Sequence, residues 1–543
     1  MMLLPLNPSL SVNRLRLAIQ VEWMVALAIT AVVLWLDVSY ARHAGALWRD
    51  ETNSVAMTAY PSLSMTWLQF DSFPLFWSVV LRGWIRAGFG QSDAGFRVFG
   101  LLMNLGIVAI LWLNAWRMSR RPPLVGLTLL GVNAAVMVYC GSIRGYGLGL
   151  VLGLWMYGAV WAYVIRPTAA RWALAAIAAL LACHTLYYNC VFVAAACLAG
   201  AGVAVSRRRW RVAASVVAMG AVAAATLPIY LPTFRGVGQW RRMYEYDGGF
   251  TGLWLKFVEA VTLGHSVMLP VWVIVLLCAP LAALLTWRHT RNDLALFAAI
   301  SLSVGLAGNV LFLRGVNYYM QPWYFLCLMA VTAAGADAAQ RAASTGRGFR
   351  IPAVAMVALA LMLISFSPLY AWSITRRTNI DEIARIVERS ATRADYIVVT
   401  DWVHGITFHR YYNGSAPWQT LPALPPDAHD VHRSDLVVKL IHRTDAISPV
   451  LDSVEQTLRS GHRVFYIGPL PEQLPVEHPG AYLIKRLEAH NPPLPLEFWR
   501  YELNYMLHEL AGEAIRIPIK LNQPISPLED LQLSVFESRQ PSQ

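Results

Sequence analysis

The sequence predicts a polytopic α-helical membrane protein with a soluble α/β domain at its C-terminus. The chain has 543 residues, of which 57% are hydrophobic and only 14% are charged. Long apolar runs recur as far as Tyr370, and each is close to the roughly 20 residues that a spanning helix needs. From Trp372 onward polar residues dominate and such runs stop. We therefore expect a transmembrane domain over 1–371 and a soluble domain over 372–543.

The apolar runs predict about eleven spans, since each is close to membrane thickness. Their approximate centres lie in 21–40, 94–116, 122–140, 147–165, 172–187, 189–205, 212–231, 268–286, 294–313, 319–337 and 351–371.

The net charge of +12 comes largely from arginines whose positions predict how the chain is oriented in the membrane. Arginines cluster in alternate short loops, which is the positive-inside pattern. We expect no nucleic-acid partner, because the basic residues flank apolar spans and form no continuous phosphate-binding face. The pattern places the N-terminus in the cytoplasm and makes the chain a multi-pass protein among membrane lipids. An odd number of spans then places both the first outer loop, 41–93, and the C-terminal domain on the outer face of the membrane.

The first outer loop begins with an acidic pair. Residues 48–51 read Trp-Arg-Asp-Glu, directly after the first span. Because a bilayer tolerates ionisable groups poorly, Asp50 and Glu51 at its surface are candidates for handling a lipid head group or an ion. Two interfacial helices are expected to follow, one around 52–60 and one over 75–89. A tilted span is the alternative for the second.

Another outer loop, 232–267, mixes arginines with aromatic residues. Arg241, Arg242 and Lys256 lie among tryptophans and tyrosines. Guanidinium groups bind phosphate bidentately, so the mixture suits contacts to sugar and phosphate. It also suits an ordinary interfacial aromatic belt.

In the C-terminal domain helical and β-rich patterns alternate, which favours an α/β fold. Helices are predicted over 378–390 and 448–460, and strands over 395–400 and 463–467. Four polar or aromatic residues between them are interpreted as fold or acceptor-docking residues: Asp401, His404, His409 and Tyr411.

These parts together resemble the GT-C superfamily of membrane glycosyltransferases. Within it the chain looks most like bacterial relatives of protein O-mannosyltransferases and the aminoarabinose transferases of lipid A. The resemblance covers roughly residues 20 to 335 as an ordered set of individually weak motifs. Its matching elements are Trp48–Glu51, Asp71–Trp77, Asp93–Arg97, Ser142–Tyr146, His184–Tyr187 and Asn317–Pro322. One departure is that the family's His-Pro-Pro is reduced to Phe73-Pro74, which puts metal dependence in doubt.

The resemblance implies transfer of a sugar from a polyprenyl-phosphate donor to a lipid, glycan or protein acceptor at the outer membrane face. Asp50 is the expected general base, and Glu51 orients the acceptor, coordinates a cation or simply starts the following helix. No cofactor is implied beyond a candidate divalent cation, for which Asp50 and Glu51 would be the ligands. Arg144 is expected to stabilise the donor phosphate. Further donor contacts are expected from Tyr146, His184, Tyr187, Asp71, Arg241, Arg242, Lys256, Arg314, Tyr318 and Tyr319.

Two other functions use the same class of lipid-linked substrate. A transporter or flippase for lipid-linked saccharides predicts charges along a path through the spans and often repeated halves. A polysaccharide polymerase usually relies on outer-loop arginines and has no acidic pair. Here the ionisable residues cluster on one face and no inverted repeat is evident, so we favour the transferase.

Overall fold

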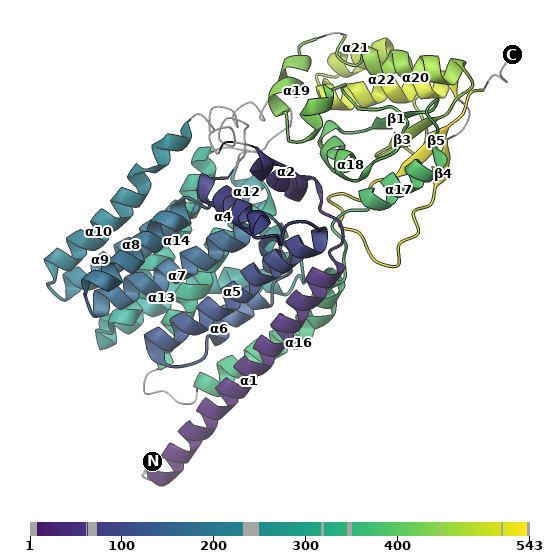
Figure 1. The fold of residues 1–543 in the computed structure, drawn as a ribbon. Coiled ribbons are helices and arrows are strands. Elements are labelled where there is room, and N and C mark those ends of the chain that lie inside the picture. The colour runs from purple at the N-terminus through teal and green to yellow at the C-terminus, as the bar shows by residue number, and fades with distance from the viewer. Residues whose placement is uncertain are drawn as a thin grey trace. The chain divides into compact units, whose positions relative to one another are not determined.

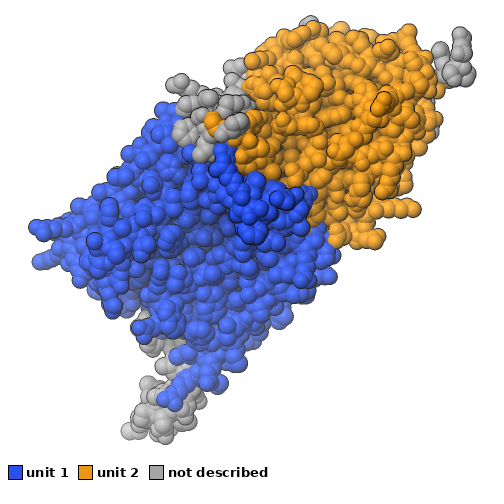
Figure 2. Space-filling model, in the orientation of Figure 1, with its two compact units in different colours: residues 1–43, 73–231, 247–374 blue, residues 44–72, 232–246, 375–543 orange. Residues whose placement is uncertain are grey.

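The computed structural model describes residues 8–60, 62, 73–231, 249–316, 320–344, 350–443, 445–511 and 514–539. Its contacts divide the chain into two compact units, coloured separately in Figure 2. The bundle unit comprises 1–43, 73–231 and 247–374, and the C-terminal unit comprises 44–72, 232–246 and 375–543. Each unit is described by itself below.

The bundle unit is built from long apolar helices (Figure 1). Eight helical stretches of the described residues are long and apolar enough to cross a membrane. They belong to α1 (Pro8–His43), α5 (Asp93–Ser119), α7 (Tyr146–Ile165), α9 (Asn189–Ser206), α10 (Trp210–Ala225), α13 (Met268–Thr290), α14 (Asp293–Val316) and α16 (Arg350–Ser373).

The three other predicted spans also coincide with helical structure. Residues 172–187 overlap α8 (Ala169–Cys183), a shorter apolar helix. The span predicted over 319–337 appears as α15 (Leu326–Ser344), which begins later than expected because a 3-10 turn, Pro322–Phe325, precedes it. All eleven segments therefore match helical structure, and the number that cross the membrane stays a prediction.

The segment predicted as a span over 122–140 is a broken helix. It consists of α6 (Leu124–Gly126) and two π-helical turns, Leu127–Gly131 and Val136–Cys140. Between the turns, the buried Asn133 side chain accepts hydrogen bonds from the backbone amides of Ala135 at 2.8 Å and Val136 at 3.3 Å. The side chain of Asn133 therefore caps the start of the second π-helical turn, as an Asn at a helix N-terminus does.

The C-terminal unit contains a five-stranded sheet in the order β2-β1-β3-β5-β4. Strands β2 (Trp418–Thr420), β1 (Tyr396–Val399) and β3 (Val464–Ile467) are parallel, whereas β5 (Leu533–Phe536) and β4 (Ile515–Ile517) add antiparallel pairs. All residues of β1, β3 and β5 are buried, as expected for strands covered on both faces. The predicted α/β character is confirmed.

Helices cover both faces of this sheet. The core on one face includes residues of α17 (Ile380–Ser390) and α18 (Gly405–Tyr411). The core on the other includes residues of α19 (Ser434–Leu440), α20 (Ser448–Arg459) and α22 (Pro495–Leu510). A further helix, α21 (Pro479–Glu488), packs against α22.

The first outer loop contributes one helix to each unit. Helix α2 (Arg49–Ala59) belongs to the C-terminal unit and packs against α18. Helix α4 (Leu75–Arg86) belongs to the bundle unit. The two interfacial helices expected from the sequence are therefore both helical, and the acidic pair lies at the start of the first.

Candidate active site

The acidic pair occupies the first turn of α2, where its two carboxylates have different surroundings. Trp48 is the N-cap residue. The Glu51 side chain is 0% exposed, and its Oε2 accepts a hydrogen bond from the Trp48 backbone amide at 3.3 Å. This is the contact that a glutamate at the third helical position makes in a capping box. The Asp50 side chain is 19% exposed. Of the two acids, Asp50 is therefore the more accessible to a substrate.

Asp50 lies beside a histidine that the sequence analysis did not single out. Its Oδ1 is 3.6 Å from Nε2 of His432 and 3.7 Å from Nε of Arg49. The backbone amide of His432 donates to Oδ1 of Asn53 on α2 at 2.9 Å, and its ring lies edge-on to Trp402 with centroids 5.8 Å apart. His432 is thus held next to the Asp50 carboxylate by Asn53 of α2 and by the ring of Trp402.

A buried carboxylate, Glu529, fixes the N-terminus of α2. Its Oε2 accepts from the Arg49 backbone amide at 3.0 Å. Its Oε1 accepts from the Thr407 hydroxyl at 2.9 Å and lies 3.2 Å from Nδ1 of His404. Negative charge at a helix N-terminus is stabilising because the first amides have no partner within the helix. Glu529 therefore sets the direction of the turn that carries Asp50.

Cations flank the indole of Trp48. The guanidinium carbon of Arg377 is 4.8 Å from the Trp48 ring centroid, and that of Arg49 is 5.5 Å away. The backbone amide of the buried Arg377 donates to the carbonyl of Ala44 at 2.8 Å. Arg377 is a second residue missed from the sequence, since it follows the last apolar run in a stretch without a motif.

Tyr411, interpreted from the sequence as a fold or docking residue, contacts the same segment. Its hydroxyl accepts from the Leu47 backbone amide at 2.7 Å. This hydrogen bond attaches the acidic segment to α18.

In the bundle unit, Arg144 is held against an aromatic face. It lies between the second π-helical turn and α7, is 6% exposed, and places its guanidinium carbon 4.4 Å from the ring centroid of Phe73. Phe73 packs edge-on against Tyr146, with centroids 5.2 Å apart. A Cβ on Gly145 would lie 2.6 Å from the Phe73 ring, so glycine permits this approach. Phe73, where the related motif carries histidine, thus supplies a cation–π contact.

His184 links the start of α4 to the connection between α8 and α9. Its Nδ1 is 2.7 Å from the Tyr230 hydroxyl and its Nε2 is 2.9 Å from the Thr226 hydroxyl. Its carbonyl accepts from the Phe76 amide at 2.9 Å. Tyr187 packs edge-on against Tyr230 at 5.4 Å. Both ring nitrogens of His184 therefore have hydroxyl partners, as a histidine with a packing role alone would, and its donor-binding role stays a prediction.

Two further predicted residues are described, one on α12 (Phe250–Thr262) and one on α14. Lys256 lies on α12 and pairs with Glu259 at 2.8 Å. Arg314 is exposed near the end of α14. The others lie outside the described residues: Asp71, Arg241, Arg242, Tyr318 and Tyr319.

Metal binding is not settled by the geometry. Across the ranges that the structure describes, no three His, Cys, Asp or Glu side chains are grouped so that they could hold a metal ion. Glu51, one of the two predicted ligands, directs Oε2 to the Trp48 amide. Cation binding by Asp50 and Glu51 remains a prediction.

Comparison with known proteins identifies the fold. No protein-family model and no curated protein sequence matches the chain. Among solved structures, it is similar to the oligosaccharyltransferase of Archaeoglobus fulgidus tethered with an acceptor peptide, with a TM-score of 0.50 and 11% identity over 95% of this chain and 74% of that one. ArnT from Cupriavidus metallidurans bound to undecaprenyl phosphate also matches, with a TM-score of 0.48 and 14% identity over 94% of this chain and 97% of that one. The likeness to the oligosaccharyltransferase is one of fold alone, and it supports the fold that the motifs led us to expect.

Proposed function

We propose that the protein transfers a sugar from a polyprenyl-phosphate donor to a lipid, glycan or protein acceptor at the outer face of a bacterial cytoplasmic membrane. The observation that carries the proposal is that the two acids of the pair have different surroundings, in a fold like that of the GT-C glycosyltransferases. Glu51 is buried and caps α2, whereas Asp50 remains accessible beside His432. Asp50 is thus an accessible carboxylate on the first turn of α2, and general base catalysis requires a carboxylate in such a fixed place.

Asp50 is proposed to take the proton from the attacking hydroxyl or amine of the acceptor. The attack forms the new glycosidic bond and breaks the bond between the sugar and the lipid phosphate. His432, 3.6 Å from the Asp50 carboxylate, is placed to orient it. The contacts of Glu529 to the start of α2 and of Tyr411 to the preceding Leu47 support this role, because a base acts efficiently only when held in fixed geometry.

Arg144 is proposed to stabilise the departing lipid phosphate. Negative charge grows on that phosphate as the sugar leaves, and a buried cation stabilises such charge more strongly than an exposed one. The face of Phe73 fixes the guanidinium before substrate arrives. Tyr146, His184 and Tyr187 are proposed to line the donor site. Secondary contacts to donor or acceptor are assigned as proposals to Asp71, Arg241, Arg242, Lys256, Arg314, Tyr318 and Tyr319.

A transfer assay tests the proposal. The purified full chain is incubated with polyprenyl-phosphate sugars extracted from its own host and with membranes from a strain that lacks the gene. Mass spectrometry should detect an acceptor heavier by one sugar. The product should disappear with Asp50→Asn and with Arg144→Gln, and should persist with Arg211→Gln, an exposed arginine on α10. Equal product from all four proteins would overturn the assignment.

A further inference from the structure

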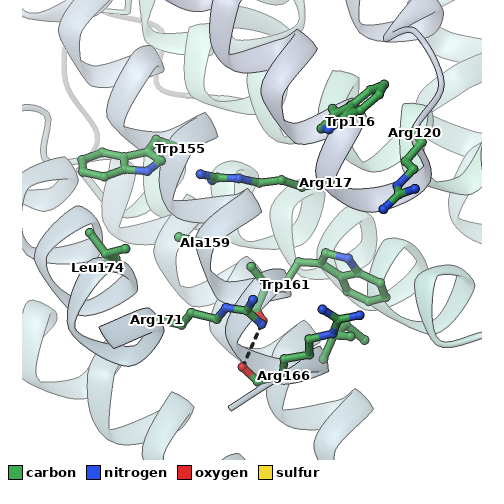
Figure 3. Close-up of a pocket in the computed structure, with 11 residues that line it drawn as sticks. Trp116, Arg117, Arg120, Trp155, Ala159, Trp161, Arg166, Arg171 and Leu174 are labelled. Carbon is green, nitrogen blue, oxygen red and sulfur yellow. Dashed lines mark hydrogen bonds between the residues drawn. The ribbon is translucent and has the colours of Figure 1, made fainter. Parts of the chain in front are cut away.

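A basic cavity lies in the bundle unit at the ends of α5, α7 and α8. It has a volume of about 500 Å³. Figure 3 shows its lining, with Arg117 extending toward Trp155 and Arg171 beside Arg166. Arg117 and Arg120 come from the end of α5, Arg166 from the end of α7 and Arg171 from α8. Four guanidinium groups from three helices therefore surround one space.

Within the described residues, no carboxylate neutralises the charges in this cavity. Its described lining contains no aspartate or glutamate, and no ion pair joins any of the four arginines to a described carboxylate. Neighbouring arginines differ: Arg121 pairs with Glu22 at 2.7 Å, and Arg207 pairs with Asp293. Arg171 instead donates to the carbonyls of Ala162 at 3.3 Å and Arg166 at 3.1 Å. Clustered cations repel one another, so an anion in the cavity would be stabilised.

The rest of the lining is apolar and aromatic. Trp116, Trp155 and Trp161 contribute indoles, and Leu174 and Ile165 contribute aliphatic surface. Trp116 is 57% exposed and Leu174 is 49% exposed. Indoles and basic residues together are typical of the level of lipid head groups. The lining thus suits a ligand that has an anionic group and a hydrocarbon part.

We propose that this cavity is a binding site for the phosphate group of an anionic glycerophospholipid. Arginine is suited to the role because its planar guanidinium binds phosphate bidentately. Basic pockets between membrane helices on the cytoplasmic side are a recognised mode of anionic lipid binding. The positive-inside pattern predicts that these loops lie on that side. The site is independent of Asp50 and of sugar transfer.

The test compares lipid binding by two double variants. Arg117→Gln/Arg120→Gln removes two cavity arginines whose side chains make no hydrogen bond to other described residues. Arg211→Gln/Arg288→Gln removes the same charge from exposed positions on α10 and α13, outside the cavity. Each protein is delipidated in detergent and titrated with phosphatidylglycerol, phosphatidylcholine or inorganic phosphate. Native mass spectrometry counts bound lipid, and thermal unfolding reports stabilisation.

Phosphatidylglycerol should bind to and stabilise the wild type and the control variant. The cavity variant should bind it about 25-fold more weakly, from about fivefold for each basic residue at an anionic surface. Equal binding of phosphatidylglycerol by both variants would overturn the site and leave these arginines only the role of orienting the chain in the membrane. Stabilisation by inorganic phosphate equal to that by the lipid would overturn the assignment to a lipid. Matching unfolding temperatures without lipid establish that both variants are folded.

Discussion

Replacing Asp50 with Asn separates a chemical from a structural role for the acidic pair. Asn preserves the size of the side chain and removes the base. Positioned proton transfer contributes about 10²- to 10⁴-fold to a rate, which corresponds to about 2.7–5.5 kcal/mol in activation free energy. We therefore expect the rate of sugar transfer to fall by at least about 100-fold.

The stability of the variant should change much less. Asp50 is partly exposed, and its basic neighbours His432 and Arg49 lie 3.6 and 3.7 Å away. Ion pairs of this kind contribute about 0–1 kcal/mol. The free energy of unfolding should therefore shift by less than the activation free energy, and the gap between the two identifies a catalytic role.

Glu51→Gln is the matched control. Glutamine can still accept the hydrogen bond from the Trp48 amide, since Glu and Gln both serve in capping boxes. Transfer rates of wild type and both variants are measured under single-turnover conditions with the same donor and acceptor membranes, and unfolding is followed by tryptophan fluorescence. Retention of more than about a tenth of the rate by Asp50→Asn would refute the reasoning, because base catalysis supplies at least about 100-fold. So would a larger loss of rate in Glu51→Gln.

Three further predictions concern other residues of the two units. Phe73→Leu removes the cation–π contact to Arg144, worth up to about 2 kcal/mol when desolvated, so the KM for donor should rise by up to about 30-fold; an unchanged KM would contradict the role given to Phe73. Glu529→Gln weakens the charged acceptor at the start of α2 and should lower the free energy of unfolding by about 1–2 kcal/mol; urea titration with unaltered stability would count against this anchor. Burial, together with the neighbouring His409, lowers the pKa of His429 from 6.5 to about 4. Because His429 takes up a proton near pH 6.5 in the unfolded chain and only near pH 4 in the folded chain, the free energy of unfolding should fall as pH drops from 6.5 to 4. His429→Gln should remove this part of the pH dependence. Equal slopes of unfolding free energy against pH in wild type and variant would contradict this prediction.

Much of the fold could be predicted because hydropathy and side-chain periodicity are local signals. An apolar run of membrane length identifies a helix from its own residues alone, and all eleven predicted segments contain helical structure. The alternation of amphipathic and β-rich stretches likewise located α17, β1, α20 and β3. The break between Leu124 and Cys140 was missed, because it depends on one buried Asn133 within an otherwise apolar run.

The candidate site could be predicted only in part, because its surroundings come from distant parts of the chain. Asp50 and Glu51 follow from their position after the first span. Their different environments depend on the cap formed within α2 and on His432 and Glu529, which tertiary folding brings to this helix. No local pattern distinguishes these two residues from other polar residues of the C-terminal domain.

Lipid and glycan analysis of a strain that lacks the gene tests the central claim most directly. The envelope acceptor should be one sugar short, and the unused polyprenyl-phosphate sugar should accumulate where a membrane-impermeant glycosidase can reach it in spheroplasts. The wild-type gene should restore the acceptor and the Asp50→Asn gene should not. Accumulation of donor protected on the cytoplasmic face would instead indicate a transporter and contradict the account.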